Sequence, residues 1–259
     1  MDKWALELHI RRSRPVNKLQ FIKAKTTGMR VLDLGCVRHN ASFALSDPDW
    51  LHAQIKEVAE YVLGVDYLAA DVEILRQHGY NVHCADVTLP LEISEQFDVI
   101  VAGDLIEHLA NFDGFIRNLQ KLLKPDGTII LSTPNPYFYD LFSFVALKRA
   151  FLINPEHTCW IDPQALSQLF QRYGFVVAQI NYLKPSWRFG DVMLISEANE
   201  FDILKGEWKN ETVGGKMFRA VTSRLFAPIW TLCKLLSPFN SAMTSCSDYI
   251  AVIERQAAP

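Results

Sequence analysis

Short apolar runs alternate along the chain with segments whose apolar residues recur every three or four positions. The runs predict buried strands, and the spaced segments predict amphipathic helices. The expected strands cover 29–34, 62–65, 81–84, 97–102, 128–132, 175–180 and 248–254. The expected helices cover 3–24 (as one or two helices), 50–61, 69–78, 112–123 and 163–173. Strands that alternate with helices indicate an α/β fold with a mostly parallel sheet.

The elements divide the chain into four parts of one expected domain. These are a helical cap (1–28), a core (29–183), an inserted helical or substrate-side subregion (184–247), and a final strand with a tail (248–259). A connection as long as 184–247 is uncommon as a plain loop, so we expect structure within it. Its segment 218–236 mixes large apolar residues with Arg and Lys. That pattern leaves open a packing or dimer face, a surface segment that reaches a lipid-linked substrate, or a lid.

Composition and charge narrow the class of protein. The net charge of -3 argues against a general nucleic-acid-binding protein. The five cysteines are scattered without a Cys-x-x-Cys motif, which favours a reduced cytoplasmic protein over a disulfide framework or zinc site. We expect no signal peptide, because no apolar run follows the basic N-terminal residues, and no uncharged run approaches the roughly 20 residues that span a bilayer. Peripheral contact with a membrane stays open.

Acidic residues follow three of the expected strands. The first strand runs into Asp33-Leu34-Gly35-Cys36, the second ends at Asp66, and Asp86 lies just beyond the third. Glycine lets the backbone pass close to a ligand, and ligands of open α/β sheets lie outside the carboxyl ends of the strands. There Asp66 can accept hydrogen bonds from ribose hydroxyls and Asp86 can meet an adenine amino group. Three coincident turn-forming or helix-capping acids are the less favoured explanation.

These motifs resemble the class I S-adenosylmethionine (SAM)-dependent methyltransferases, above all the MetW-like and ubiquinone-biosynthesis-like domains. The resemblance covers 29–180 and is carried by Val31–Cys36, Gly64–Asp66, Ala85-Asp86, Phe97–Ile100, Gly103–Leu109, Leu123–Gly127 and Ser132–Asn135. It implies a seven-stranded Rossmann-like sheet with an antiparallel last strand and helices on both faces. It also implies SAM as the cofactor, held by Asp33, Gly35, Cys36, Asp66, Tyr67, Asp86, Val87 and Gly103.

The loop after the first strand departs from the family pattern. Members usually read Gly-x-Gly-x-Gly, whereas this chain reads Gly35-Cys36-Val37-Arg38-His39. An NAD site needs those glycines for its pyrophosphate, and SAM has no pyrophosphate. The loss therefore disfavours an NAD-dependent oxidoreductase. A non-catalytic SAM-fold module that binds a partner stays as the main alternative to an enzyme.

The candidate catalytic residues follow the fourth strand. Asp104, Glu107 and His108 would lie on one face of a helix, at i, i+3 and i+4. In one interpretation His108 is a general base that takes a hydroxyl proton. In another, Asp104, Glu107, His108 and His157 bind a divalent ion such as Mg²⁺, as is implied by the similar Glu-x-x-Glu-His of ubiquinone-biosynthesis O-methyltransferases and small-RNA 2′-O-methyltransferases. In a third, Glu107 and His108 only brace the helix.

The resulting functional hypothesis is O-methylation of a small-molecule or sugar hydroxyl. The family resemblance suggests polysaccharide or secondary-metabolite biosynthesis as its setting. Positioning the acceptor oxygen in line with the methyl group supplies much of the acceleration in such a transfer. The expected partner is thus a small acceptor, with no nucleic acid and with a homodimer left open.

Overall fold

The computed structural model describes residues 13, 15–138, 141, 154, 156–183, 201–202, 207–208 and 246–256. Residues 3–12 of the helical segment expected over 3–24, and the segment 218–236, lie outside this part of the chain. Of the expected insert, it includes residues 246–247 and two short strands that pair antiparallel, β7 (Phe201–Asp202) and β8 (Glu207–Trp208).

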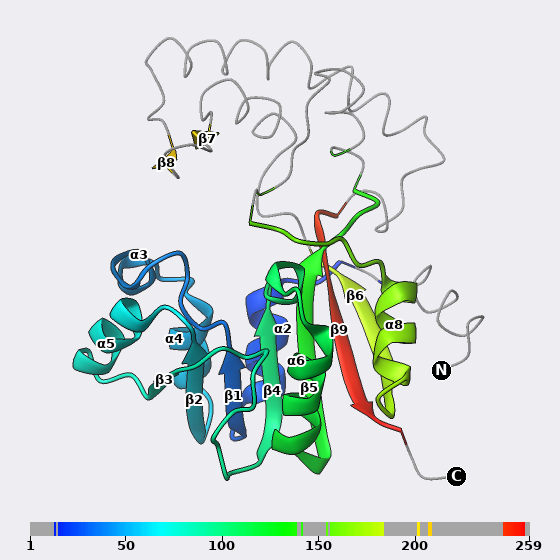
Figure 1. Ribbon diagram of the computed structural model, residues 1–259, viewed down its shortest axis with the longest axis horizontal. Coiled ribbons are helices and arrows are strands. Elements are labelled where there is room, and N and C mark those ends of the chain that lie inside the picture. The colour runs from blue at the N-terminus through cyan, green and yellow to red at the C-terminus, as the bar shows by residue number, and fades with distance from the viewer. Residues whose placement is uncertain are drawn as a thin grey trace.

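Seven strands form one sheet in the order β3-β2-β1-β4-β5-β9-β6 (Figure 1). Their bounds are β1 Arg30–Leu34, β2 Tyr61–Asp66, β3 Val82–Cys84, β4 Phe97–Gly103, β5 Leu123–Pro134, β6 Phe175–Tyr182 and β9 Asp248–Arg255. Strands β1 to β5 pair in parallel, and β9 runs antiparallel between β5 and β6. The expected Rossmann-like methyltransferase sheet, with its last strand beside the sixth, is confirmed.

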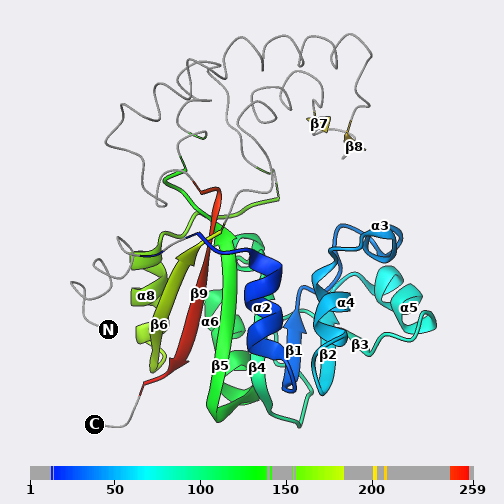
Figure 2. The same ribbon diagram turned by 180° about the vertical axis from the view of Figure 1, so that it is seen from behind.

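Helices cover both faces of the sheet. Their bounds are α2 Lys18–Thr26, α3 Ala41–Ser46, α4 Leu51–Lys56, α5 Ala69–Gln77, α6 Phe112–Leu122 and α8 Pro163–Gln171. On the face seen in Figure 1, α6 and α8 bury Phe115 and Phe170 in the largest apolar cluster. On the opposite face, seen in Figure 2, α2 and α4 bury Ile22 and Ile55 in a second cluster. No helix in the described part of the chain is both long and apolar enough to cross a membrane.

Helix starts follow from capping side chains. Asn17, Asn40, Asn111 and Asp162 each accept a hydrogen bond from a backbone N–H in the first turn of the helix that follows. These bonds satisfy N–H groups that lack a partner within the helix.

Two helices near the loop that follows β1 differ from the sequence prediction. The helix expected over 50–61 ends at Lys56, because the backbone N–H groups of Val58 and Ala59 turn back to the carbonyl of Ile55 before β2 begins. Helix α3 was not predicted, since its six residues are too few to show a helical period.

Strand register brings the expected site together. Asp33 lies opposite Gly64 on β2 and Val101 on β4, and Gly103 lies opposite Ser132 on β5. The carboxyl ends of β1 to β4 therefore meet at one edge of the sheet, where ligands of such folds bind.

Candidate functional site

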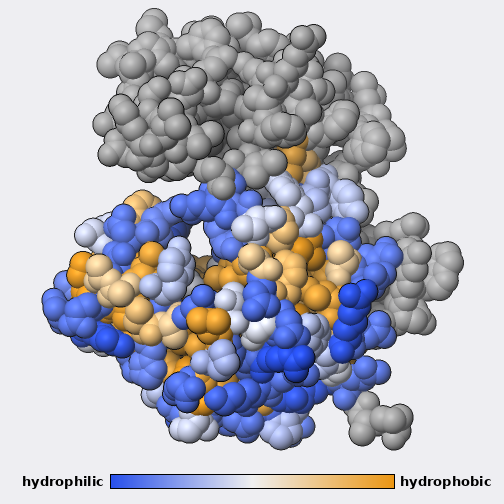
Figure 3. Space-filling model, viewed as in Figure 1, coloured by the Kyte–Doolittle hydropathy of each residue, from blue (hydrophilic) through white to orange (hydrophobic). Residues whose placement is uncertain are grey.

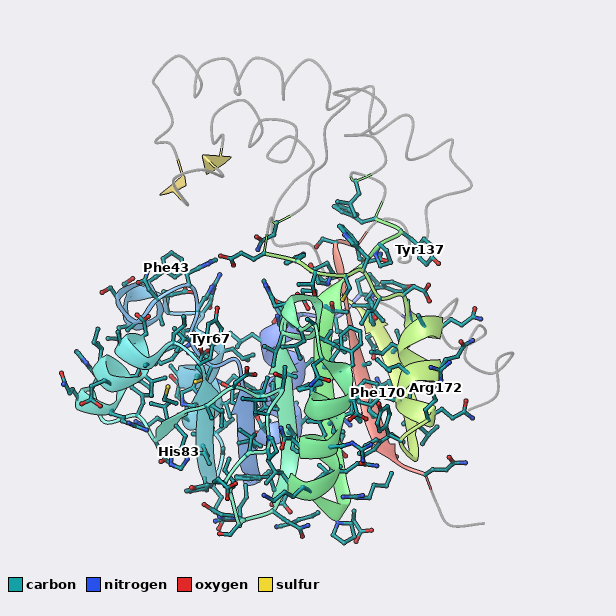
Figure 4. The ribbon with its side chains drawn as sticks, viewed as in Figure 1. Phe43, Tyr67, His83, Tyr137, Phe170 and Arg172 are labelled. Atoms are coloured by element: carbon teal, nitrogen blue, oxygen red, sulfur yellow. The ribbon has the colours of Figure 1, made fainter. Side chains whose placement is uncertain are left out.

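The surface is hollowed at this edge, between α3 and the segment that follows β4 (Figure 3). Phe43 of α3 and Tyr67 after β2 lie at the same end of the molecule (Figure 4). Both are exposed, with 72% of Tyr67 accessible. An apolar ring open to solvent beside a row of strand ends is suited to contact a flat ligand such as a nucleobase.

Gly35 turns the chain sharply after β1. Its φ of 73° lies in the left-handed region, and a Cβ there would stand 3.0 Å from Leu105 Cδ1. Its N–H donates to the carbonyl of Val65 at 2.8 Å, which ties the turn to β2. The conformation thus favours glycine here, and a larger residue would also have to displace the side chain of Leu105. The next helix, α3, begins only at Ala41.

The two loop positions where the family usually has glycine, 37 and 39, differ in backbone conformation. At the second glycine position, Val37 is buried, and its φ is not in the left-handed region. At the third, His39 has a φ of 58°. A left-handed conformation costs a non-glycine residue about 1 kcal/mol or more, although histidine adopts it more often than most. The loop therefore keeps its shape with strain at one position only.

Side chains from neighbouring elements fix this loop. Asp66 Oδ2 accepts from the N–H of Val37 at 2.9 Å, and Trp50 Nε1 donates to the carbonyl of Cys36 at 2.8 Å. Burial raises the pKa of the Cys36 thiol, and the nearby Asp33 and Asp66 add to the effect. Cys36 is therefore a neutral packing residue under the loop rather than a nucleophile.

The expected ribose-binding residue, Asp66, is 5% exposed. Burial raises the pKa of its carboxyl, although hydrogen bonds from the backbone N–H groups of Val37, Leu68 and Tyr67 oppose the rise. A carboxylate offers about four acceptor positions, so these three bonds leave one for a ligand hydroxyl.

Asp86 lies exposed beyond β3. Its Oδ1 accepts from the N–H of Thr88 at 2.8 Å and from Thr88 Oγ1 at 2.7 Å. The turn-forming role that the sequence left open is therefore present.

Val87, expected beside the cofactor, is 6% exposed and belongs to the apolar core. Its carbonyl accepts from the side chain of buried Asn118 at 2.8 Å, which anchors this turn to α6.

Asp33 is held by a residue that sequence reasoning missed. His52 Nδ1 lies 2.8 Å from Asp33 Oδ2, with both side chains buried. The signal for His52 was weak, because a histidine within a short helix carries no motif.

The segment after β4 corrects the expected helical face. Asp104 has a φ of 53°, and the chain then makes a single 3₁₀ turn over Ile106–His108. This conformation interrupts the α-helical spacing on which the prediction of one shared face rested. Asp104 is therefore exposed, whereas Glu107 is buried beside Ile106.

Asp104 forms an ion pair with Lys18 and accepts from Ser132 Oγ at 2.7 Å. Desolvation by the surrounding protein would raise the pKa of Asp104. The Lys18 charge, the hydrogen bonds from Lys18 and Ser132, and the nearby His108 outweigh this effect, so the pKa of Asp104 is lowered. Nearby, burial and the charge of Asp104 raise the pKa of Asp248 to about 6. Lys18, Ser132 and Asp248 were not predicted, because the fold and not the sequence order brings them to Gly103 and Asp104.

Glu107 is 2% exposed, and its Oε2 accepts from Thr133 Oγ1 at 2.9 Å. Its Oε1 has no hydrogen-bond partner among the residues that the structure describes. Burial, reinforced by the charge of Asp104, raises the pKa of Glu107 to about 8. The metal-free protein thus holds a neutral carboxyl here at neutral pH.

Glu107, His108 and His157 come together although the two histidines are 49 positions apart in the sequence. One possible ligand atom from each lies within 4.8 Å of the others. The N–H of Thr158 donates to the carbonyl of Glu107 at 2.8 Å and thereby docks His157 onto the 3₁₀ turn. Burial and the neighbouring His108 lower the pKa of His157, which favours its neutral, ligating form. Asp104, the fourth expected ligand, pairs with Lys18 and lies outside this group.

Comparison with known proteins identifies the family of the chain. A family model described as a methyltransferase domain matches residues 8–180. The chain is 28% identical over 176 residues to a ubiquinone biosynthesis O-methyltransferase of Coxiella burnetii, covering 63% of this chain and 71% of that protein. It is 29% identical over 120 residues to the mitochondrial ubiquinone biosynthesis O-methyltransferase of Rattus norvegicus, covering 42% of this chain and 32% of that protein.

A solved structure shares the fold. A SAM-dependent methyltransferase from Archaeoglobus fulgidus superposes with a TM-score of 0.51 at 19% identity, covering 98% of this chain and 100% of that one. The expected family and enzyme class are confirmed, and the matches give no support to the NAD-dependent oxidoreductase or the non-catalytic module. The chain belongs to the family of class I SAM-dependent methyltransferases.

Proposed function

We propose that this enzyme methylates a hydroxyl oxygen of a small-molecule or sugar acceptor, which Glu107, His108 and His157 position at the exit of β4. The observation that carries the proposal is the convergence of these three side chains within 4.8 Å. Relatives named ubiquinone biosynthesis O-methyltransferase support oxygen as the nucleophile. In the reaction, the acceptor oxygen attacks the methyl carbon, the carbon–sulfur bond breaks, and S-adenosylhomocysteine leaves.

The cofactor is proposed to lie along the carboxyl ends of β1 to β4. Asp66 would bind the ribose hydroxyls, with Tyr67 beside the adenine and Asp86 near its amino group. Asp33, Gly35, Cys36 and Gly103 would border the methionine part. Lys18 is a further candidate, because a Cβ at Gly103 would stand 3.8 Å from its Nζ. An ammonium at that point can pair with the carboxylate of SAM.

A divalent ion fits the acceptor side of the site. Glu107 Oε1 is a buried oxygen that lacks a partner among the described residues, and two imidazoles stand beside it. One carboxylate with two imidazoles suits zinc, iron or manganese ions better than Mg²⁺, which prefers an all-oxygen shell. Bound there, an ion would lower the pKa of the acceptor hydroxyl. Without an ion, His108 is the residue able to accept that proton.

Calorimetric titration with SAM and S-adenosylhomocysteine tests the cofactor site. We expect wild-type protein to bind both ligands, and Asp66→Ala to lose that affinity because the ribose acceptor is gone. Glu92→Gln, which removes an exposed carboxyl, serves as the matched control and should bind like wild type. Equal affinity in wild type and Asp66→Ala would contradict the proposed cofactor site.

Methyl transfer from labelled SAM to a panel of catechol, phenol and sugar acceptors tests the chemistry. Each reaction is run with a chelator and with added Mg²⁺, Mn²⁺ or Zn²⁺. If an ion acts, the chelator and Glu107→Gln both abolish transfer, and a metal restores the wild type alone. If His108 acts as the base, transfer survives the chelator and is lost in His108→Ala. Label found on nitrogen or carbon would refute O-methylation.

A further inference from the structure

We propose that His52 is a positioning residue for SAM binding, which orients the Asp33 carboxylate by donating a hydrogen bond from Nδ1. The inference rests on the proposed cofactor role of Asp33. It concerns a residue of α4 that lies behind the cofactor loop and does not itself need to touch the ligand.

The contact between the two side chains is short and shielded from water. Nδ1 and Oδ2 lie 2.8 Å apart, and the two side chains are 0% and 3% exposed. Within the described residues, His52 supplies the only hydrogen bond that the Asp33 carboxylate accepts. A buried carboxylate without a donor is unfavourable, and one with a single donor keeps acceptor positions for a ligand. Removing His52 therefore changes where Asp33 points.

Packing fixes the orientation of the imidazole. Its ring packs beside those of Trp50 and Tyr80, with centroids 5.4 and 5.8 Å away, and these two rings lie 4.7 Å from each other. On the β2 side the ring occupies space that a side chain at Gly64 would fill, since a Cβ there would stand 2.8 Å from His52 Cε1. A ring confined on these sides holds Nδ1 toward Asp33 without the rotational freedom of an exposed histidine.

The same cluster reaches the loop itself. Trp50, two residues before His52, donates from Nε1 to the carbonyl of Cys36. Helix α4 thus contacts both the strand end at Asp33 and the loop that lacks two glycines. These two side-chain hydrogen bonds hold the end of β1 and the loop that follows it.

The two ring nitrogens of His52 differ in a way that permits a sharp test. Nε2 is buried and has no hydrogen-bond partner among the described residues. With the proton on Nδ1, the neutral ring donates to Asp33 and leaves Nε2 as a bare acceptor. Only the Nδ1 position performs the proposed role. An asparagine amide can reach that position, whereas a glutamine amide extends toward the place of Nε2.

The experiment compares SAM affinity by calorimetry in full-length His52→Asn, His52→Gln and His52→Leu. We expect the Gln and Leu variants to raise the Kd for SAM about tenfold or more, the scale of one lost hydrogen bond to a charged group. The Asn variant should stay within about threefold of wild type, since it keeps the donor. His78→Leu removes an exposed histidine outside this cluster, so it is the matched control and should bind like wild type.

A double-mutant comparison of His52 and Asp33 shows whether loss of His52 acts through Asp33 or through general destabilisation of the protein. In an Asp33→Asn background, His52→Leu should cause little further loss of SAM affinity, because the two residues act as one unit. Additive losses would overturn the inference, as would Asn and Gln variants that weaken SAM equally. Unchanged affinity in His52→Leu together with lost affinity in Asp66→Ala would overturn the role of His52 alone. Unchanged affinity in both would overturn the proposed cofactor site as well.

Discussion

Glu107 gives the most direct test of the electrostatics at the acceptor side. Burial raises its pKa from 4.5 to about 8. The folded protein then binds this proton more tightly than the unfolded chain does, so the contribution to stability is complete below pH 4.5 and is lost as pH rises toward 8. Each pH unit inside that window is worth about 1.4 kcal/mol, which amounts to roughly 3 to 4 kcal/mol between pH 5 and pH 8.

The perturbation is Glu107→Gln, which keeps an acceptor for Thr133 Oγ1 and cannot ionise. Unfolding by urea, followed by tryptophan fluorescence, gives the free energy of unfolding at pH 5, 6.5 and 8 in the presence of a chelator. The difference between variant and wild type should grow in favour of the variant by roughly 3 kcal/mol over this range. The amide leaves buried N–H groups to satisfy, so the change with pH, and not the value at one pH, is the quantity to compare.

An exposed carboxyl provides the reference. Glu92→Gln removes the same chemical group at the surface and should follow the pH dependence of wild type. Parallel pH profiles for Glu107→Gln and wild type would refute the reasoning, because they would mean that Glu107 ionises in the folded protein as easily as in the unfolded chain.

Three further substitutions probe the cofactor side. Gly64→Ala should lower the free energy of unfolding by about 1 to 3 kcal/mol, because its Cβ would stand 2.7 Å from Cys36 Sγ; equal urea midpoints would contradict this. His39→Gly should have a free energy of unfolding that is higher than that of wild type or lower by at most about 1 kcal/mol, because the relief of left-handed strain offsets the extra conformational entropy of glycine in the unfolded chain. A larger fall in urea unfolding would show that the contact of His39 with Phe43 dominates. Asn118→Ala should lower the free energy of unfolding by about 2 to 3 kcal/mol in the same assay, since three hydrogen bonds to the turn after β3 are lost, two of them buried. An unchanged midpoint would exclude that anchoring role.

The sequence predicted most of the sheet because its central strands β1, β2 and β4 are apolar on both faces. In β4, five of the seven residues are buried, and such a run is visible without knowledge of its neighbours. The acids at the strand ends could also be placed, since the carboxyl ends of parallel strands meet at one edge. The place of Asp33, Asp66 and Asp86 followed from strand order alone.

The details of the site depend on conformations that a periodic pattern does not encode. A left-handed residue at Asp104 turns a predicted helix into one 3₁₀ turn and sends Asp104 and Glu107 to different surroundings. Lys18 and His52 come from separate helices and reach the site only after the sheet has formed. Contacts of this kind are set by tertiary packing, so neither motif nor spacing could have indicated them.

The opposite pKa shifts of Asp104 and Glu107 follow from this single turn. Asp104 lies exposed against the Lys18 ammonium, which keeps its carboxyl ionised, and that charge adds to burial in holding a proton on Glu107. Neighbouring carboxyls with opposed shifts can serve opposed roles, one as a fixed charge and one as a proton-bearing group. A divalent ion that binds Glu107 must displace its proton and gains affinity as pH rises. The same rise in pH lowers the stability of the metal-free protein, because it ionises the buried Glu107 carboxyl. Ion binding would therefore add most to stability at high pH, where the metal-free protein is least stable.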